Sequence, residues 1–129
     1  MASAIFLRGG KLLLAMRAAH KTMYPRCWDI LGGHVEAGET VEQALIRESE
    51  EEVGLTPTSY SFAADLADPY PELHGEGVHH IYIVRAWEGG EPRMLGDEHT
   101  QLRWFTPVEA CGLPDLAIDA YRPIFMSLA

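Results

Sequence analysis

The segment GGHVEAGETVEQALIRESEEEVGL, residues 32–55, places a glycine-rich loop directly before a strongly patterned helix. Thr40 with Gln43 three residues later predicts a capping box at the start of this helix, and Gly54 stands where a C-terminal cap belongs. The paired glycines at the start of the segment allow the backbone to approach a ligand closely. The segment therefore predicts a helix over Thr40–Val53 with a ligand-accessible loop before it.

The predicted helix carries acidic residues on the side that should be apolar. At about 100° per residue, Glu48 and Glu52 continue the apolar stripe that begins at Val41, and Glu51 lies at its edge. A solvated acidic face would lie opposite that stripe. Three neighbouring carboxylates repel one another unless a cation is bound, and an all-oxygen set suits Mg²⁺, Mn²⁺ or Ca²⁺. The helix by itself leaves a glutamate-rich, solvent-facing helix end as the alternative.

The same segment resembles the Nudix box, G-x5-E-x7-R-E-U-x-E-E-x-G-U, in which U is usually a bulky aliphatic residue. The matching residues are Gly33, Glu39, Arg47, Glu48, Glu51, Glu52, Gly54 and Leu55. Ser49, at the first U position, is a departure that touches no acid. The resemblance favours the metal site over the solvated helix, and it leaves the subfamily open.

The resemblance implies an α/β fold, a Nudix-type α/β/α sandwich around a mixed sheet, with the box as loop–helix–loop. At 129 residues the chain is expected to be a single Nudix domain, residues 1–129. The pattern outside the box predicts a hairpin of Ala2–Leu7 and Lys11–Met16, strands at Ser61–Leu66, His80–Trp87 and Leu102–Thr106, a loop over 68–77 and a terminal helix over Pro114–Leu128.

The metal site that the resemblance implies uses the box carboxylates. Glu48, Glu51 and Glu52 would be ligands of one or more Mg²⁺ ions, with Mn²⁺ as the alternative metal. The carbonyl of Gly33 would be a further ligand. Arg47 and Glu39 would support the loop and orient the acids rather than touch substrate.

Further residues are candidates for catalysis and substrate binding. A carboxylate has to accept a proton from the attacking water, and the resemblance leaves Glu48 and Glu98 as the two alternatives. Arg17 is the candidate phosphate contact, with a surface arginine as its alternative. Trp28 is a candidate for stacking on a base, with a place in the core as its alternative.

The implied activity is cleavage of a diphosphate linkage in a nucleoside triphosphate or a related NDP-X molecule. The chain has no asparagine, the residue with which 8-oxo-dGTP-cleaving members often bind the oxidised base. Pro71 stands 16 residues after the box, as a proline does in ADP-ribose-cleaving members. An ADP-ribose or nucleotide-sugar pyrophosphatase and a non-catalytic nucleotide-binding module therefore remain as alternatives.

Composition narrows the class of partner. A formal net charge of −9 argues against a nucleic-acid polymer, whose backbone is bound by clustered lysine and arginine. No apolar run is long enough to span a membrane, and no signal-peptide pattern is present. Cys27 and Cys111 form no CxxC pair, so we expect a reduced, cytoplasmic chain. The oligomeric state stays open, with a homodimer as one alternative.

Overall fold

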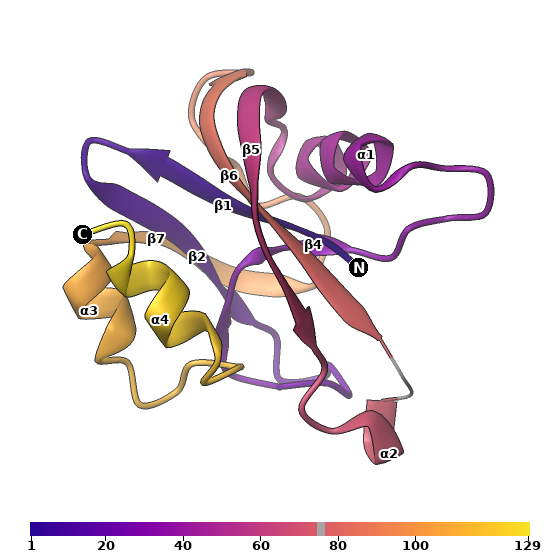
Figure 1. The fold of residues 1–129 in the computed structure, drawn as a ribbon, viewed down its shortest axis with the longest axis vertical. Helices are drawn as coiled ribbons and strands as arrows, with labels where there is room; N and C mark the ends of the chain where they lie inside the picture. Colours follow the sequence, from indigo (N-terminus) through magenta and orange to yellow (C-terminus); the bar gives the residue numbers. More distant parts are fainter. Residues whose placement is uncertain (75–76) are drawn as a thin grey trace.

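The computed structural model describes residues 1–74 and 77–129. In chain order these residues form β1 (Ala2–Arg8), β2 (Lys11–Arg17), β3 (Trp28–Asp29), β4 (Leu31–Gly33), α1 (Val41–Val53), β5 (Thr56–Ala67), α2 (Pro71–His74), β6 (Val78–Glu88), β7 (His99–Phe105), α3 (Pro107–Cys111) and α4 (Tyr121–Met126). The strands belong to one mixed sheet, in which β1 pairs in parallel with β6 and the other pairings are antiparallel (Figure 1).

The predicted hairpin is confirmed, but its two strands stay together only at the tip. Leu7 pairs with Leu12 and Arg8 pairs with Lys11. Beyond that tip β1 turns to β6 and β4, whereas β2 pairs with β7 and β3. The hairpin thus joins two halves of the sheet, and the space where they diverge lies between β4 and the ends of β2 and β7.

Helix α1 begins and ends where its sequence predicts. The Thr40 side chain accepts a hydrogen bond from the Gln43 backbone N–H, and the Gln43 side chain accepts one from the Thr40 backbone N–H. Gly54 ends the helix in the left-handed conformation, with φ 71°. These local contacts fix the ends of α1, and the packing of Ala44 and Leu45 in the core decides which side of the helix faces the sheet.

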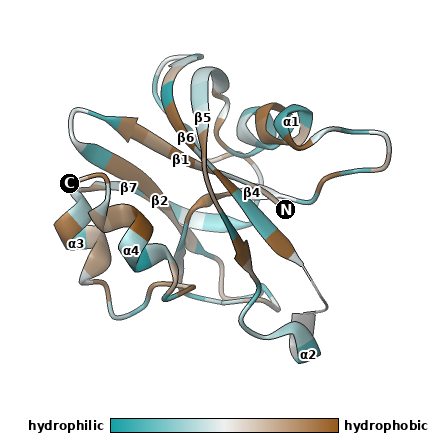
Figure 2. Cartoon of the chain, viewed as in Figure 1, coloured by the Kyte–Doolittle hydropathy of each residue, from teal (hydrophilic) through white to brown (hydrophobic). Residues whose placement is uncertain are grey.

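Two hydrophobic clusters pack on opposite faces of the sheet. Alternation along β1 sends Phe6 to the cluster that contains Leu45 of α1, and Ile5 to the cluster that contains Phe125 of α4. Figure 2 shows hydrophobic residues along β1 and β2, and both hydrophobic and hydrophilic residues on α1. Helices therefore cover both faces of a mixed sheet, which confirms the predicted α/β class.

The predicted helix over Pro114–Leu128 is wrong in its first half. The helical residues are α4 and, before it, α3, which starts with Thr106 as N-cap in a capping box with Glu109. Between them the chain runs beside β3: Trp28 donates its N–H to the Asp115 carbonyl at 2.8 Å, and its own carbonyl accepts from Ala117 at 2.8 Å. Pairing with a distant strand satisfies backbone groups that a local pattern assigns to a helix.

Three other predicted elements differ in extent. The strand predicted at Ser61–Leu66 is longer in the structure, where it extends over the whole of β5. Its pairing with β6 also includes polar residues that show no apolar alternation. The strand predicted at Leu102–Thr106 starts at His99, and that at His80–Trp87 is confirmed within β6. The predicted loop over 68–77 contains α2, and its residues 75 and 76 lie outside the described residues.

Among the described residues no helix combines the length and the apolar character needed to cross a membrane.

The glycine pair after β6 generates a stability prediction. A Cβ at Gly89 would overlap the backbone carbonyl oxygen of Gly54, whereas one at Gly90 would meet nothing within 4 Å. Both residues have positive φ, 113° and 79°, so both alanine variants carry a left-handed penalty of about 1–2 kcal/mol. We expect Gly89→Ala to lower the free energy of unfolding by a further ~1–3 kcal/mol, measured by urea denaturation. Equal losses in the two variants would contradict this packing of the Gly89 turn on the end of α1.

Candidate active site

A cavity of about 450 Å³ opens where the two halves of the sheet diverge. Five of the residues singled out from the sequence line it: Arg17, Gly33, Glu48, Glu52 and Glu98. They come from β2, β4, α1 and the loop before β7. Segments far apart in the sequence therefore meet at one concave surface.

Glu52 is the most deeply buried of the cavity acids, with 7% of its surface exposed. Its Oε2 accepts a hydrogen bond from the Gly32 backbone N–H at 3.3 Å. Burial, followed by the negative charges of Glu48 and Glu98, raises the pKa of Glu52 to about 9. A carboxyl group with so few compensating contacts favours either a proton or a bound cation.

The Glu48 carboxylate packs directly on Gly33. A Cβ at Gly33 would overlap all three atoms of that carboxylate group, so the close approach depends on the missing side chain. The Glu48 side chain is 16% exposed, and its Oε1 accepts a hydrogen bond from Arg47 Nη1 at 2.8 Å. Gly33 and Glu48 therefore meet at the wall of the cavity, as a shared ligand set requires.

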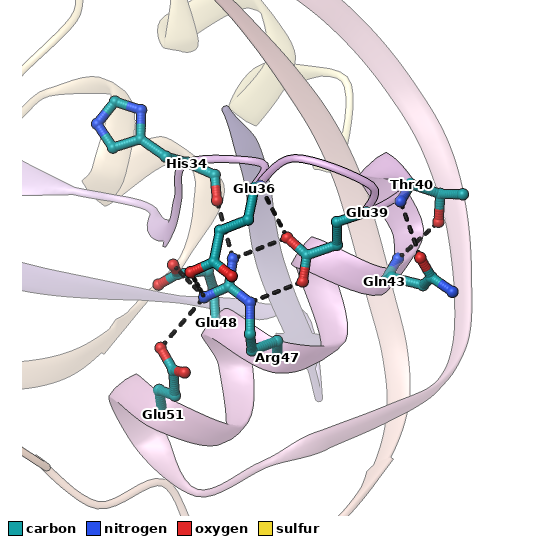
Figure 3. Close-up of polar contacts among 8 residues, drawn as sticks. All are labelled: His34, Glu36, Glu39, Thr40, Gln43, Arg47, Glu48 and Glu51. Atoms are coloured by element: carbon teal, nitrogen blue, oxygen red, sulfur yellow. Dashed lines mark hydrogen bonds and ion pairs between the residues drawn. The ribbon is translucent and has the colours of Figure 1, made fainter.

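Arg47 connects the box loop to the box helix (Figure 3). Its Nε and Nη2 donate to the two oxygens of Glu39 at 2.7 and 2.9 Å, and Nη2 also donates to the His34 carbonyl at 2.9 Å. These hydrogen bonds lower the pKa of Glu39 to about 2. In Figure 3 the His34 ring points away from this network. The contacts agree with the support role expected of Arg47 and Glu39, which stays a prediction.

Glu51 does not reach the cavity. Its side chain is 59% exposed, and its Oε2 accepts from Arg47 Nη1 at 3.3 Å, the same nitrogen that donates to Glu48. Of the three predicted carboxylate ligands, Glu48 and Glu52 therefore line the cavity, and Glu51 lies beside Glu48 on Arg47 without lining it. Across residues 1–74 and 77–129, no three acidic, histidine or cysteine side chains are close enough together to hold a metal ion.

The donor set at the cavity still fits a hard divalent cation. Glu48, Glu52 and Glu98 offer carboxylate oxygens, and Gly33 lies beside them. Mg²⁺ binds through one or two carboxylates and keeps waters in its remaining positions. The buried, poorly compensated Glu52 is the group that such a cation would satisfy.

Glu98 reaches the cavity through the loop between β6 and β7. This loop is tied to the end of α1, because Arg93 N–H donates to the Val53 carbonyl at 3.0 Å and Leu95 N–H donates to the Glu52 carbonyl at 3.1 Å. The Glu98 carboxylate then lies 3.6 Å from Lys21 Nζ. The family resemblance singled out Glu98 as an acid in the loop before the last strand. The bonds of this loop to the end of α1, and the Ala18 N–H that donates to the Glu98 carbonyl at 2.9 Å, place it at the cavity.

Arg17 lies at the cavity wall with a side chain that is 17% exposed. Its Nε donates to the Met23 carbonyl at 2.7 Å, and its Nη1 lies 3.6 Å from Asp29 Oδ2. A partly buried arginine at a cavity wall is a suitable phosphate contact. That role remains a prediction.

Trp28 corrects one expectation. It is 6% exposed and packs edge-to-face on Phe105 in the cluster below α3 and α4, with ring centroids 5.0 Å apart. It does not line the cavity. The core alternative is therefore the correct one, because the indole ring packs within a buried cluster that includes Phe105.

Asp29 and His79 line the cavity but were not selected from the sequence. Burial raises the pKa of Asp29 to about 6 and lowers the pKa of His79. A signal for Asp29 was present, since an acid within the apolar run 28–31 is a buried charge that needs a partner. No comparable local signal marks His79, because its position depends on the pairing of β6 with β1.

Comparison with known proteins agrees with this geometry. The family model described as "NUDIX domain" matches residues 1–128. The chain is 35% identical to a CTP pyrophosphohydrolase of Escherichia coli over 113 residues, which cover 87% of this chain and 78% of that protein. It is 37% identical to an 8-oxo-dGTP diphosphatase of the same organism over 98 residues, which cover 76% and 71%.

An ADP-ribose pyrophosphatase of Methanocaldococcus jannaschii is 33% identical over 115 residues, which cover 89% of this chain and 64% of that protein. Among solved structures, a MutT Nudix hydrolase from Burkholderia pseudomallei superposes with a TM-score of 0.85 at 29% identity, covering 98% of this chain and 95% of the other. The ORF135 protein of Escherichia coli superposes with a TM-score of 0.79 at 33% identity, covering 98% and 86%.

The box residues, the α/β fold that presents them and the family match over nearly the whole chain lead to one conclusion: this chain belongs to the Nudix hydrolase family.

Proposed function

We propose that this chain is a Mg²⁺-dependent pyrophosphohydrolase that cleaves a diphosphate linkage in a nucleoside triphosphate or a related NDP-X molecule. The observation that carries the proposal is the meeting of Glu48, Glu52 and Gly33 in one cavity, on a complete Nudix box. Hydrolysis of a phosphorus anhydride is the activity named for relatives that match most of the chain. We further propose that the chain acts as one domain, residues 1–129, in the cytoplasm.

Glu48, Glu52 and the Gly33 carbonyl would hold the metal, with Glu51 as a fourth residue of the box set. Bound Mg²⁺ would neutralise the diphosphate and lower the pKa of a coordinated water, and Mn²⁺ would substitute for it. The contacts of Arg47 with Glu39 and with Glu48 keep the loop and the helix in one arrangement. This support fits the role of residues that orient ligands without touching substrate.

The protein groups around that set divide the remaining work. Arg17 would bind phosphate oxygens at the opposite wall of the cavity. Glu48 and Glu98 are the two carboxylates that can accept the proton of the attacking water. Glu98 is 52% exposed and paired with Lys21, whereas Glu48 is held by Arg47. Because Glu48 is already proposed as a metal ligand and accepts a hydrogen bond from Arg47, we favour Glu98 as the group that approaches the attacking water.

The substrate class follows from the relatives and from one absence. The CTP- and 8-oxo-dGTP-cleaving relatives both support a nucleoside triphosphate. The chain contains no asparagine, which weighs against recognition of the oxidised base of 8-oxo-dGTP. The ADP-ribose-cleaving relative supports the NDP-X alternative, together with Pro71. A binding module without catalysis is a less favoured alternative, because every box carboxylate is present.

A substrate screen tests the proposed activity. Purified protein with Mg²⁺ should release phosphate or pyrophosphate from one class among nucleoside triphosphates, 8-oxo-dGTP, ADP-ribose, dinucleoside polyphosphates and nucleotide sugars. EDTA should abolish that release, and Mn²⁺ should restore it at least in part. No release from any compound, with nucleotides still raising the melting temperature, would replace the hydrolase with the binding module.

The Glu52→Gln variant tests the metal site. It keeps the size of the side chain and removes the charge, so we expect kcat/KM to fall by at least about 100-fold with an unchanged far-ultraviolet circular dichroism spectrum. Glu50→Gln is the matched control, since Glu50 lies on the same helix but is exposed and bonds Thr56. Activity of Glu52→Gln close to that of Glu50→Gln would overturn the assignment.

The raised pKa of Glu52 predicts how stability depends on pH. A carboxyl whose pKa rises from 4.5 unfolded to about 9 folded stabilises the fold below pH 4.5, and this stabilisation is lost as the pH rises through 9. One such group contributes at most about 1.4 kcal/mol per pH unit. In EDTA, the free energy of unfolding of wild type relative to Glu52→Gln should therefore fall between pH 6.5 and 9. Added Mg²⁺ should reduce this decline, and a difference independent of pH would contradict the burial of a titrating Glu52.

A further inference from the structure

Arg17 enters the cavity at an irregular point of the sheet. The pairing of β2 with β7 shifts register between Met16 and Arg17. Such a bulge turns a side chain away from its regular direction. The Arg17 backbone is fixed there as well, because its N–H donates to the Cys27 carbonyl at 2.9 Å. The guanidinium therefore has a set starting point at the cavity wall.

Asp29 faces that guanidinium with only one of its two oxygens. Its Oδ1 accepts hydrogen bonds from the Tyr121 hydroxyl at 2.9 Å and from the Ile30 N–H at 2.8 Å. Its Oδ2 lies 3.6 Å from Arg17 Nη1. The two donors on Oδ1 hold the carboxylate plane, so Oδ2 is presented to Arg17 in one direction.

The distance between Asp29 and Arg17 decides how many N–H donors of the guanidinium stay available for a ligand. The chain also contains a closed arginine–carboxylate pair, in which Arg8 donates to both oxygens of Glu91 at 2.9 and 3.0 Å. In such a pair two N–H groups of the guanidinium are used up. At 3.6 Å from Asp29, Arg17 is attracted and oriented, yet it keeps N–H donors for a ligand.

Tyr121 links this pair to the opposite side of the sheet. Its side chain is 1% exposed and belongs to the core below α4, beside Phe125. Behind the main cavity, a recess of about 40 Å³ reaches Tyr121, Asp29 and Arg17 together. The hydroxyl of Tyr121 thus holds Asp29 from α4, a helix that carries none of the box residues.

We propose that Asp29, held by the Tyr121 hydroxyl, is a positioning residue that aims the Arg17 guanidinium at the phosphate oxygens of the substrate. The inference rests on the proposed function, since it requires a phosphorylated ligand in this cavity. Asp29 lines the cavity, but as an acid it acts through Arg17 rather than by binding an anionic ligand, and Tyr121 does not line the main cavity. Their effect passes through Arg17 alone, which distinguishes positioning from a general contribution to folding.

Tyr121→Phe is the variant that tests this arrangement, because it removes one hydroxyl and leaves the ring in the core. Tyr60→Phe is its matched control: it removes a hydroxyl that donates to a carboxylate, Glu42, at 3.2 Å, outside the cavity. The probe is inorganic pyrophosphate with Mg²⁺, titrated by calorimetry. Steady-state kinetics on the best compound of the substrate screen give kcat and KM separately.

We expect Tyr121→Phe to weaken pyrophosphate binding and raise KM by about three- to tenfold, the effect of one lost hydrogen bond. The value of kcat should change less than about twofold, because the lost contact acts on substrate and transition state alike. Tyr60→Phe should match wild type. In an Arg17→Ala background, which itself binds pyrophosphate weakly, Tyr121→Phe should have no further effect.

The outcomes separate this inference from the proposed function. Turnover by wild type with a Tyr121→Phe defect that persists in the Arg17→Ala background would overturn positioning and leave the hydrolase intact. The expected pattern of pyrophosphate affinities without turnover of any compound would support positioning and overturn the hydrolase. Failure of wild type to bind pyrophosphate would overturn positioning. Should Tyr121→Phe not fold, Asp29→Asn takes its place with the same expected pattern.

Discussion

The burial of the Glu52 carboxylate against β4 is the constraint on which the rest of the site depends. A charged carboxylate is costly to desolvate, and here one backbone N–H from Gly32 at 3.3 Å is the nearest compensation, while Glu48 and Glu98 add repulsion. Such a group persists inside a fold only where the surroundings hold it and where a proton or cation completes it. The cost of burying Glu52 is therefore the physical reason why we propose a metal at this cavity.

The parts that hold Glu52 in place come from three directions. Local caps at Thr40 and Gly54 set the ends of α1. Arg47 joins the helix to its loop through Glu39. The loop between β6 and β7 donates N–H groups to the carbonyls of Val53 and Glu52 itself. The last contact uses the helix end, whose carbonyls lack partners within the helix, and it brings Glu98 to the same cavity.

The opposite wall follows a different logic. Arg17 and Asp29 are both largely buried. Their opposite charges lie 3.6 Å apart, without the two hydrogen bonds of a bidentate pair. The Tyr121 hydroxyl connects them to α4, on the face of the sheet that carries no box residue. The acidic wall thus combines contacts within the box with contacts from the loop before β7, whereas the basic wall depends on contacts between the first strands and the last helix. The proposed metal ligands of the box are therefore positioned largely by neighbours in sequence, and the proposed phosphate contact is positioned by residues far apart in the chain.

The sequence by itself determined the family, the ends of α1 and three of the five predicted residues that line the cavity, namely the box residues Gly33, Glu48 and Glu52. These features depend on spacing along one helix and one loop, where neighbours in sequence are neighbours in space. The other two, Arg17 and Glu98, lie outside the box, and only the pairing of β2 and the contacts of the loop before β7 with α1 bring them to the same cavity. Only the tertiary structure decided that Glu51 does not line the cavity, that Trp28 is core and that residues 115–117 run beside β3. These outcomes depend on where α1, β3 and the later segments lie relative to one another. The order of residues along the chain does not specify those long-range contacts.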